Sequence, residues 1–154
     1  MKNLDYPVRK NIRLANYDYS LNGYYFITIC TNGNSSLFGL INNGEIILNN
    51  SALIIKKWLF ELENKFNVKI DYYSIMHNHI HFILILDGSN EPLSKIIQWF
   101  KTMTTNAYIK GVKSGEFLPF NKKLWQRNYY EHIIRDEKSL YEIRQYIQNN
   151  PIDL

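Results

Sequence analysis

Residues 76–86, MHNHIHFILIL, join three alternating histidines to an apolar run. From Phe82 onward both alternating faces are apolar, which is typical of a strand that is covered on both sides. Residues two apart point to the same face of a strand, so His77, His79 and His81 would share one side if the extended geometry runs back to His77. The stretch therefore predicts a central strand that carries histidines at its beginning.

Other segments around this strand also have the composition of strands. The run YYFITICT at 24–31 is rich in β-branched and aromatic residues, and residues 69–76 form a further short extended run. In LFGLINNGEIIL, residues 37–48, the Asn43-Gly44 pair between two apolar runs predicts a hairpin. The aromatic segment 124–134, LWQRNYYEHII, predicts the last strand with its approach.

Three segments have apolar residues at helical spacing. Residues 51–66 predict a first helix, and residues 93–111 predict a second helix that ends near Gly111. The last helix would begin at the capping-box pattern of Ser139 and Glu142 and end before Pro151.

The order of these elements indicates an α+β fold. It contains the β-α-β-β-α-β series of a ferredoxin-like antiparallel sheet with helices, with an extra β-hairpin after the first strand and an appended C-terminal helix. A chain of 154 residues with no linker or repeat indicates a single domain, 1–154, in which residues 1–20 form a basic N-terminal arm.

Composition and charge restrict the class of protein. The formal net charge of +4 favours a polyanionic partner such as nucleic acid. Cys30 is the single cysteine, which excludes a disulfide framework and a thiolate zinc cluster. No apolar run is long enough to span a bilayer and the first residues contain no apolar signal region, so we expect a cytoplasmic protein without a membrane segment.

The alternating histidines are candidates for a metal site. At about 3.3 Å per residue, histidines two apart lie about 7 Å apart at the backbone, so two imidazoles can converge on one ion but three hardly can. The pair His79/His81 encloses Ile80, which can enter a core, whereas His77/His79 encloses the polar Asn78. We therefore choose His79 and His81, although hydrogen-bonded surface histidines would give the same pattern.

Two histidines are too few for a structural zinc site. An open site for Mg²⁺ or Mn²⁺ would need an oxygen ligand from elsewhere. On the last helix, Tyr146 and Asn150 are four residues apart and share the edge of the buried face. Tyr146 could equally be a ring packed at the margin of the core.

Four segments taken in chain order resemble the REP-associated tyrosine transposases: MHNHIH, FKTMTTNAY, LWQRNYYEHIIRDEKSL and YIQNNP. These enzymes belong to the single-tyrosine HUH transposase superfamily, where HUH means His, hydrophobic residue, His. The likeness also includes NYDYS and YYFITICT and covers nearly the whole chain. One departure is His77, which stands where the family usually has proline and introduces a competing ligand.

The resemblance implies a function, a fold and a set of site residues. It implies an RRM-like fold and a transposase-like single-stranded DNA endonuclease and strand transferase that acts at hairpin-marked sites through a 5′-phosphotyrosine intermediate. By position, His79, His81 and Asn150 would bind a divalent metal, Mg²⁺ or Mn²⁺, and Tyr146 on the appended helix would be the nucleophile. The partner would be single-stranded DNA with hairpin structure, and the protein would be a monomer or a homodimer.

Basic and aromatic residues outside this set are candidates for DNA contacts, because cations with aromatic faces suit single strands. His132 is a candidate base for the tyrosine proton, although it could equally be a structural strand residue. The candidates for backbone contacts are Lys101, Arg127, Arg135 and Arg144, and those for base stacking are Trp125, Tyr129 and Tyr130.

Two other functions stay open from the residues alone. The alternating histidines approximate the pattern of histidine-triad nucleotide hydrolases, although Asn78 stands where that pattern has an apolar residue. A non-catalytic RRM-like module, or a domesticated transposase that binds single-stranded nucleic acid without cutting it, would also fit.

Overall fold

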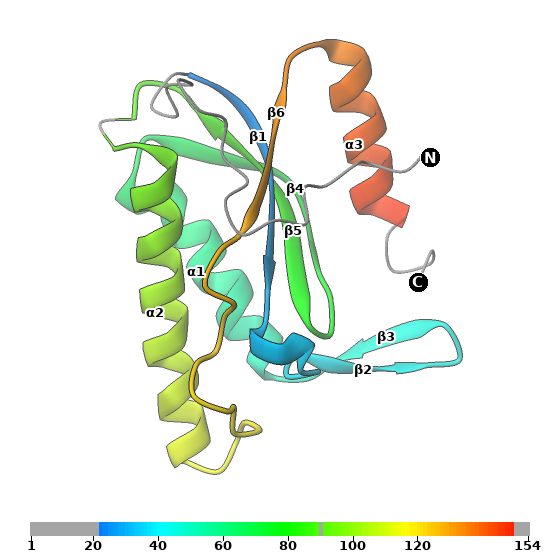
Figure 1. Cartoon of the computed structure of the whole chain (residues 1–154), viewed down its shortest axis with the longest axis vertical. Helices are drawn as coiled ribbons and strands as arrows, with labels where there is room; N and C mark the ends of the chain where they lie inside the picture. The colour runs from blue at the N-terminus through cyan, green and yellow to red at the C-terminus, as the bar shows by residue number, and fades with distance from the viewer. Residues whose placement is uncertain (1–21, 90, 150–154) are drawn as a thin grey trace.

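A four-stranded antiparallel sheet forms the centre of the computed structural model, which describes residues 22–89 and 91–149 (Figure 1). The strand that carries the histidines pairs with the first strand along its full length, so both are central. Across the sheet the strands follow the order β4 (Val68–Ile75), β5 (His79–Leu86), β1 (Gly23–Cys30) and β6 (Tyr130–Ile134).

The connections between these strands are those of a ferredoxin-like fold. The helix α1 (Ser51–Lys65) joins β1 to β4, and α2 (Leu93–Lys113) joins β5 to β6. In each case the two joined strands are separated by one antiparallel neighbour, so two β-α-β units interleave in one sheet. The predicted α+β fold with a ferredoxin-like antiparallel sheet is confirmed.

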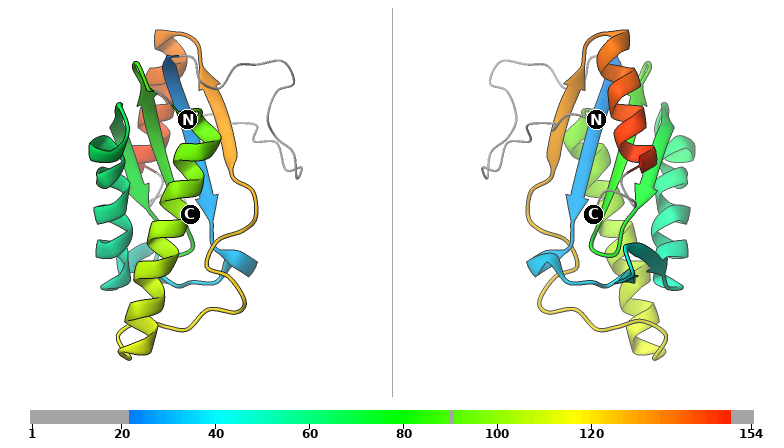
Figure 2. Two further views of the ribbon diagram at one scale, coloured as in Figure 1. Left: turned by 90° about the vertical axis from the view of Figure 1, so that its left-hand side faces the viewer. Right: turned by 90° about the vertical axis from the view of Figure 1, so that its right-hand side faces the viewer.

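The two faces of the sheet are covered differently. Figure 2 shows α1 and α2 on one face and the last helix, α3 (Glu137–Asn149), on the other. Alternation along β1 divides its side chains between the faces: Tyr25 and Ile27 enter the core under α1 and α2, whereas Phe26 enters a smaller core under α3. The smaller core also contains Ile83, Ile134, Ile143 and Ile147.

The extra hairpin after the first strand is formed by β2 (Gly39–Asn42) and β3 (Glu45–Leu48), which follow the short 3-10 turn η1 (Asn32–Asn34). Asn43 and Gly44 have φ angles of 53° and 79°, the left-handed geometry that a two-residue turn requires. The predicted Asn-Gly hairpin is confirmed. It extends away from the main sheet in Figure 1.

The structure gives exact bounds for two predicted segments. Within the predicted strand and its approach, 124–134, the strand is Tyr130–Ile134, and the approach makes one isolated bridge, between Trp125 and Thr31. The second helix runs two residues past Gly111, whose lack of a side chain lets Phe117 pack against it.

The start of the last helix was predicted wrongly. The helix begins at Glu137, and the Asp136 carboxylate accepts a hydrogen bond from the Ser139 backbone N–H at 2.7 Å. This bond to the backbone lowers the pKa of Asp136. Asp136 therefore fills the capping position that the pattern of Ser139 and Glu142 predicted for Ser139.

The predicted basic arm, residues 1–20, lies outside the described residues. Within the described ranges, no helix is both long and apolar enough to cross a membrane.

Candidate active site

His79 and His81 lie at the beginning of β5, on the sheet face that carries α3. Their cross-strand partners on β1 are Cys30 and Thr28. The two imidazoles converge, because their Nε2 atoms are 3.1 Å apart. The structure thus brings together the pair that strand spacing had selected.

The opposite nitrogen of each ring is held by a neighbouring polar side chain. Nδ1 of His79 lies 2.7 Å from Oδ1 of Asn78, and Nδ1 of His81 lies 2.8 Å from the Thr28 hydroxyl. The Asn78 amide group donates to the Asn34 carbonyl, which leaves its Oδ1 facing His79. Since an amide oxygen only accepts, Nδ1 of His79 carries the proton and its Nε2 presents a lone pair.

Burial keeps these two imidazoles neutral. Desolvation, with a smaller effect from His77, lowers the pKa of His79 to about 4. The pKa of His81 is lowered further below its usual value by deeper burial and by His79. Neutral imidazoles with converging Nε2 atoms are suitable ligands for a divalent cation.

Tyr146 reaches this pair from α3. Its ring packs on His81 with a centroid distance of 5.5 Å and on Phe26 at 6.1 Å. The neighbouring helix residues Ile143 and Ile147 are buried against the sheet, so Tyr146 lies half-buried at the margin of the smaller core. Tyr146, the candidate nucleophile, therefore meets the histidine pair on one face of the sheet, although it is 65 residues from His81 in the sequence.

An ion pair fixes the helix that carries Tyr146. The Arg144 guanidinium donates to both carboxylate oxygens of Asp71 on β4, at 2.7 and 2.9 Å. The same guanidinium lies 5.3 Å from the centre of the Tyr72 ring. Two parallel hydrogen bonds restrain both the position and the orientation of α3 against the edge of the sheet.

The described residues supply no further His, Cys, Asp or Glu side chain that could bind an ion together with His79 and His81. Within 22–89 and 91–149, no group of three His, Cys, Asp or Glu side chains could hold an ion together. Asn150, the predicted oxygen ligand, lies outside the described residues.

Comparison with known proteins decides the family. The sequence profile described as "Transposase IS200 like" matches residues 38–150, well over half of the chain. The chain belongs to the IS200-like transposase family.

Two individual proteins are similar to this chain over most of its length. A protein of unassigned function from Haemophilus influenzae is 39% identical to this transposase over 94% of this chain and 88% of its own. A second protein of that organism, described provisionally as a REP-associated tyrosine transposase, is 24% identical over 90% of this chain and 77% of its own.

Solved structures share the fold. A REP-associated tyrosine transposase bound to a REP hairpin superposes with a TM-score of 0.63 at 18% identity, over 92% of this chain and 73% of that one. A protein from Deinococcus radiodurans, described provisionally as a transposase, superposes with a TM-score of 0.59 at 14% identity, over 89% of this chain and 95% of that one. The resemblance to REP-associated tyrosine transposases is confirmed.

Several predicted DNA contacts of this IS200-like transposase are engaged within the fold. Lys101 donates to the carbonyls of residues 126, 127 and 128, at 2.8 to 3.2 Å, and so holds the segment before β6. Arg144 is paired with Asp71. Arg127 and Arg135 are exposed, and their role as DNA contacts stays a prediction.

The predicted base-stacking residues divide in the same way. Trp125 is 4% exposed and its indole N–H donates to Thr104, while Tyr129 is 5% exposed, so the prediction that these two rings stack on bases does not fit their packing in the core. Tyr130 is half-buried, opposite Thr28 and on the same sheet face as His81. His132 is exposed on β6 as the cross-strand neighbour of Phe26.

Sequence reasoning missed the residues that orient the site. Thr28, Asn78 and Asp71 hold His81, His79 and Arg144, respectively. Asn78 adjoins the histidines and could have been found there. Thr28 and Asp71 could not, because their contacts depend on which strands and helices pair.

His77 remains apart from the converging pair. Its ring centroid is 6.5 Å from that of His79, and its Nδ1 is buried without a hydrogen-bond partner among the described residues. Its backbone carbonyl accepts a hydrogen bond from Phe38, which ties the turn between β4 and β5 to the segment before β2.

Proposed function

We propose that this IS200-like transposase is a metal-dependent endonuclease and strand transferase of single-stranded DNA, with Tyr146 as nucleophile. The observation that carries the proposal is the convergence of the His79 and His81 Nε2 atoms, 3.1 Å apart, beside the Tyr146 ring. Nucleophile and cation ligands are the two parts that transfer of a phosphodiester to tyrosine requires.

The histidine pair fits a divalent cation. The two Nε2 atoms are 3.1 Å apart, close enough for both to bind one ion. Mg²⁺ or Mn²⁺ held by His79, His81 and, by family position, Asn150 would neutralise charge on the phosphate and orient it. Neutral imidazoles would leave the full charge of such an ion for this task.

In the proposed reaction the Tyr146 oxygen forms a bond to phosphorus, and the bond from phosphorus to the 3′-oxygen of the preceding nucleotide breaks. The phenol proton leaves to solvent and the departing 3′-oxygen takes up a proton, so the products are a 5′-phosphotyrosine and a free 3′-hydroxyl. Attack of a 3′-hydroxyl on the phosphotyrosine reverses these changes and joins strands. The Arg144–Asp71 ion pair holds α3 so that Tyr146 stays beside His81.

The proposed substrate is single-stranded DNA marked by a hairpin, and the reaction would take place in the cytoplasm. The solved REP-associated tyrosine transposase of the same fold is bound to a REP hairpin, which supports this choice. The chain's positive net charge also favours a nucleic acid.

We expect the purified protein with Mg²⁺ or Mn²⁺ to become covalently attached to a hairpin oligonucleotide. A label at the 3′ end of the DNA should migrate with the protein on a denaturing gel, whereas a 5′ label should stay on the released fragment. Tyr146→Phe should abolish the adduct because it removes the attacking oxygen.

Tyr141 provides the matched control, since it is on the same helix and 65% exposed. Tyr141→Phe should retain the adduct. An adduct that survives Tyr146→Phe, or that carries the 5′ label, would contradict the assignment. Binding without cleavage under either metal would support the non-catalytic alternative, and metal-independent hydrolysis of a nucleoside phosphoramidate would support the histidine-triad alternative.

A further inference from the structure

The outer face of α2 carries a stripe of mostly polar side chains. Residues on its inner face, among them Ile96, Phe100 and Tyr108, are buried in the main core. The outer residues recur at spacings of three and four and form one line along the helix. They are Lys95, Gln98, Trp99, Thr102, Thr105, Asn106 and Ile109.

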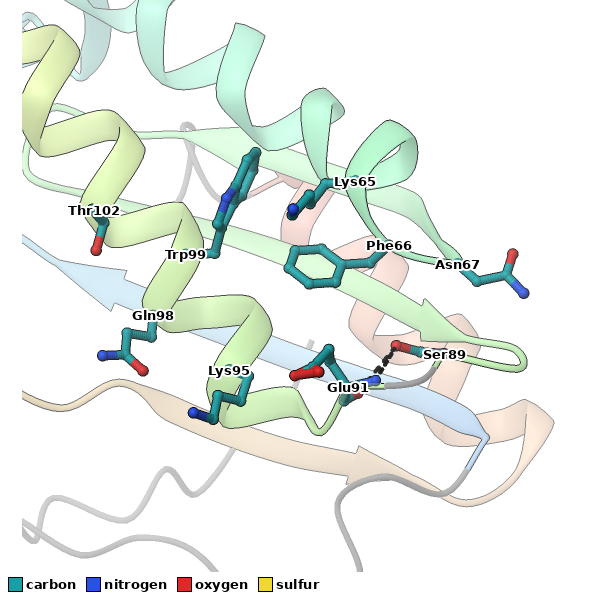
Figure 3. A pocket seen from close by; sticks show the side chains of 9 residues that line it. All are labelled: Lys65, Phe66, Asn67, Ser89, Glu91, Lys95, Gln98, Trp99 and Thr102. Atoms are coloured by element: carbon teal, nitrogen blue, oxygen red, sulfur yellow. Dashed lines mark hydrogen bonds between the residues drawn. The ribbon is translucent and has the colours of Figure 1, made fainter.

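A pocket of about 590 Å³ lies at the N-terminal half of this stripe (Figure 3). Figure 3 shows Lys65 and Phe66 reaching it from the end of α1, and Lys95 and Trp99 from α2. The Trp99 ring is half-buried and packs edge-to-face against Phe66, with centroids 5.6 Å apart. Aromatic rings flanked by lysines can contact a base and its phosphate together.

A second pocket, of about 420 Å³, lies farther along α2. It is bounded by the segment that follows the helix, which contributes Lys122, Lys123 and Arg127. Thr102 lines both pockets, so they meet on the surface of α2. We call the two together the α2 groove; Lys95 to Ile109, at about 1.5 Å per residue, spans about 21 Å.

The α2 groove has a strong excess of positive charge. Six basic side chains and one acidic side chain, Glu91, line it. The formal charge of this lining, +5, exceeds the net charge of +4 of the whole chain. Within residues 22–89 and 91–149, none of its four exposed lysines forms an ion pair. Unpaired lysines beside an aromatic pocket favour a polyanion with unpaired bases over a protein surface.

The groove and the candidate active site lie on opposite sides of the sheet but approach each other at one end. The Gln126 backbone N–H donates to the Cys30 carbonyl at 2.8 Å, and Cys30 is the cross-strand partner of His79. Arg127, at the end of the groove, follows directly in the chain. A strand leaving the histidine pair can therefore reach the groove around this end of the sheet.

We propose that the α2 groove binds a single-stranded segment of the DNA substrate that flanks the cleavage site. Phosphates contact Lys122, Lys123 and Arg127 and then Lys95 and Lys65, and a base packs in the pocket at Trp99. This inference rests on the proposed function for the identity of the strand. The binding surface itself is separate from the histidines and Tyr146.

Binding of a fluorescent oligothymidylate of about 16 nucleotides, measured by anisotropy in EDTA, tests the groove without cleavage or a hairpin. The variant Lys95→Gln/Lys123→Gln removes one charge from each pocket at exposed positions. Its affinity should fall about tenfold, and the slope of log K against log salt should decrease by about 1.4, since each phosphate contact on a single strand contributes about 0.7.

The control variant Lys69→Gln/Lys138→Gln removes two exposed charges outside the groove and should bind like the unaltered protein. An equal loss of oligothymidylate affinity in both variants would overturn the proposed groove. So would a duplex of the same length that competes for binding as well as the single strand does. If the unaltered protein forms no covalent adduct but the groove variant alone loses binding, the groove stands and the proposed reaction fails. If adduct forms but the groove variant binds normally, the reaction stands and the groove fails.

Discussion

His81 depends on a residue from another strand for its orientation. The Thr28 hydroxyl lies 2.8 Å from Nδ1 of His81, and this contact directs Nε2 toward His79. Both side chains are buried, so no water replaces the threonine easily. Partners of this kind fix the ring orientation and the tautomer of a metal-binding histidine.

Thr28→Val should weaken metal-dependent adduct formation by about 10- to 100-fold while leaving the fold intact. Valine has nearly the same shape as threonine but lacks the hydroxyl, so the His81 ring loses its restraint. The Mn²⁺ concentration at half-maximal adduct formation measures the effect. Thr28→Ser, which keeps the hydroxyl, should recover most of the activity, and failure to do so would assign the loss to packing instead.

The helix α3 is the element that completes the candidate site. It contributes two buried residues, Ile143 and Ile147, and within residues 22–89 and 91–149 no other helix covers its face of the sheet (Figure 2). Its attachment therefore depends strongly on specific contacts: the Asp136 cap at its start and the ion pair between Arg144 and Asp71.

Arg144→Gln should destabilise the protein by about 1–2 kcal/mol, because the pair is partly exposed and lies between surface and buried ion pairs in strength. Adduct formation should fall by more than this loss of stability alone would explain, since Tyr146 is two residues from Arg144. Urea unfolding and hydrogen exchange of α3 measure the two effects. In a double-mutant cycle with Asp71→Asn, additive losses would show that the ion pair does not couple helix and sheet.

At the scale of the whole molecule, the sheet separates the candidate active site from the α2 groove. One face, under α3, holds the histidine pair and Tyr146; the other carries α1 and α2, the main core and the α2 groove. Because β5 is central, a side chain on either of its faces is supported by strands on both sides. The candidate metal site is thus built on one of the two central strands of the sheet.

A cation that binds the folded protein should stabilise it. Mn²⁺ at about 100 times its dissociation constant should add about 2.7 kcal/mol to the free energy of unfolding, observed as a rise in melting temperature that EDTA reverses. His79→Ala or His81→Ala should lose this rise. His77→Ala should keep it, because the His77 ring is outside the converging pair; loss of the rise in His77→Ala would make His77 a ligand.

The sequence by itself determined the elements and the candidate chemistry. Apolar periodicity, the Asn43-Gly44 turn and the alternation of His79 and His81 are local features, and local backbone geometry converts them directly into helices, a hairpin and a shared strand face. The start of the last helix at Ser139 was predicted wrongly because a competing cap at Asp136 decided it.

Only the tertiary structure decided how the site is assembled. Thr28 meets His81 across 53 residues of sequence, and Asp71 meets Arg144 across 73. Likewise Trp125, an apparent base-stacking residue, became part of the core. Such contacts follow from strand register and helix docking, which depend on the free energy of the whole packed chain and leave no pattern in any short stretch of it.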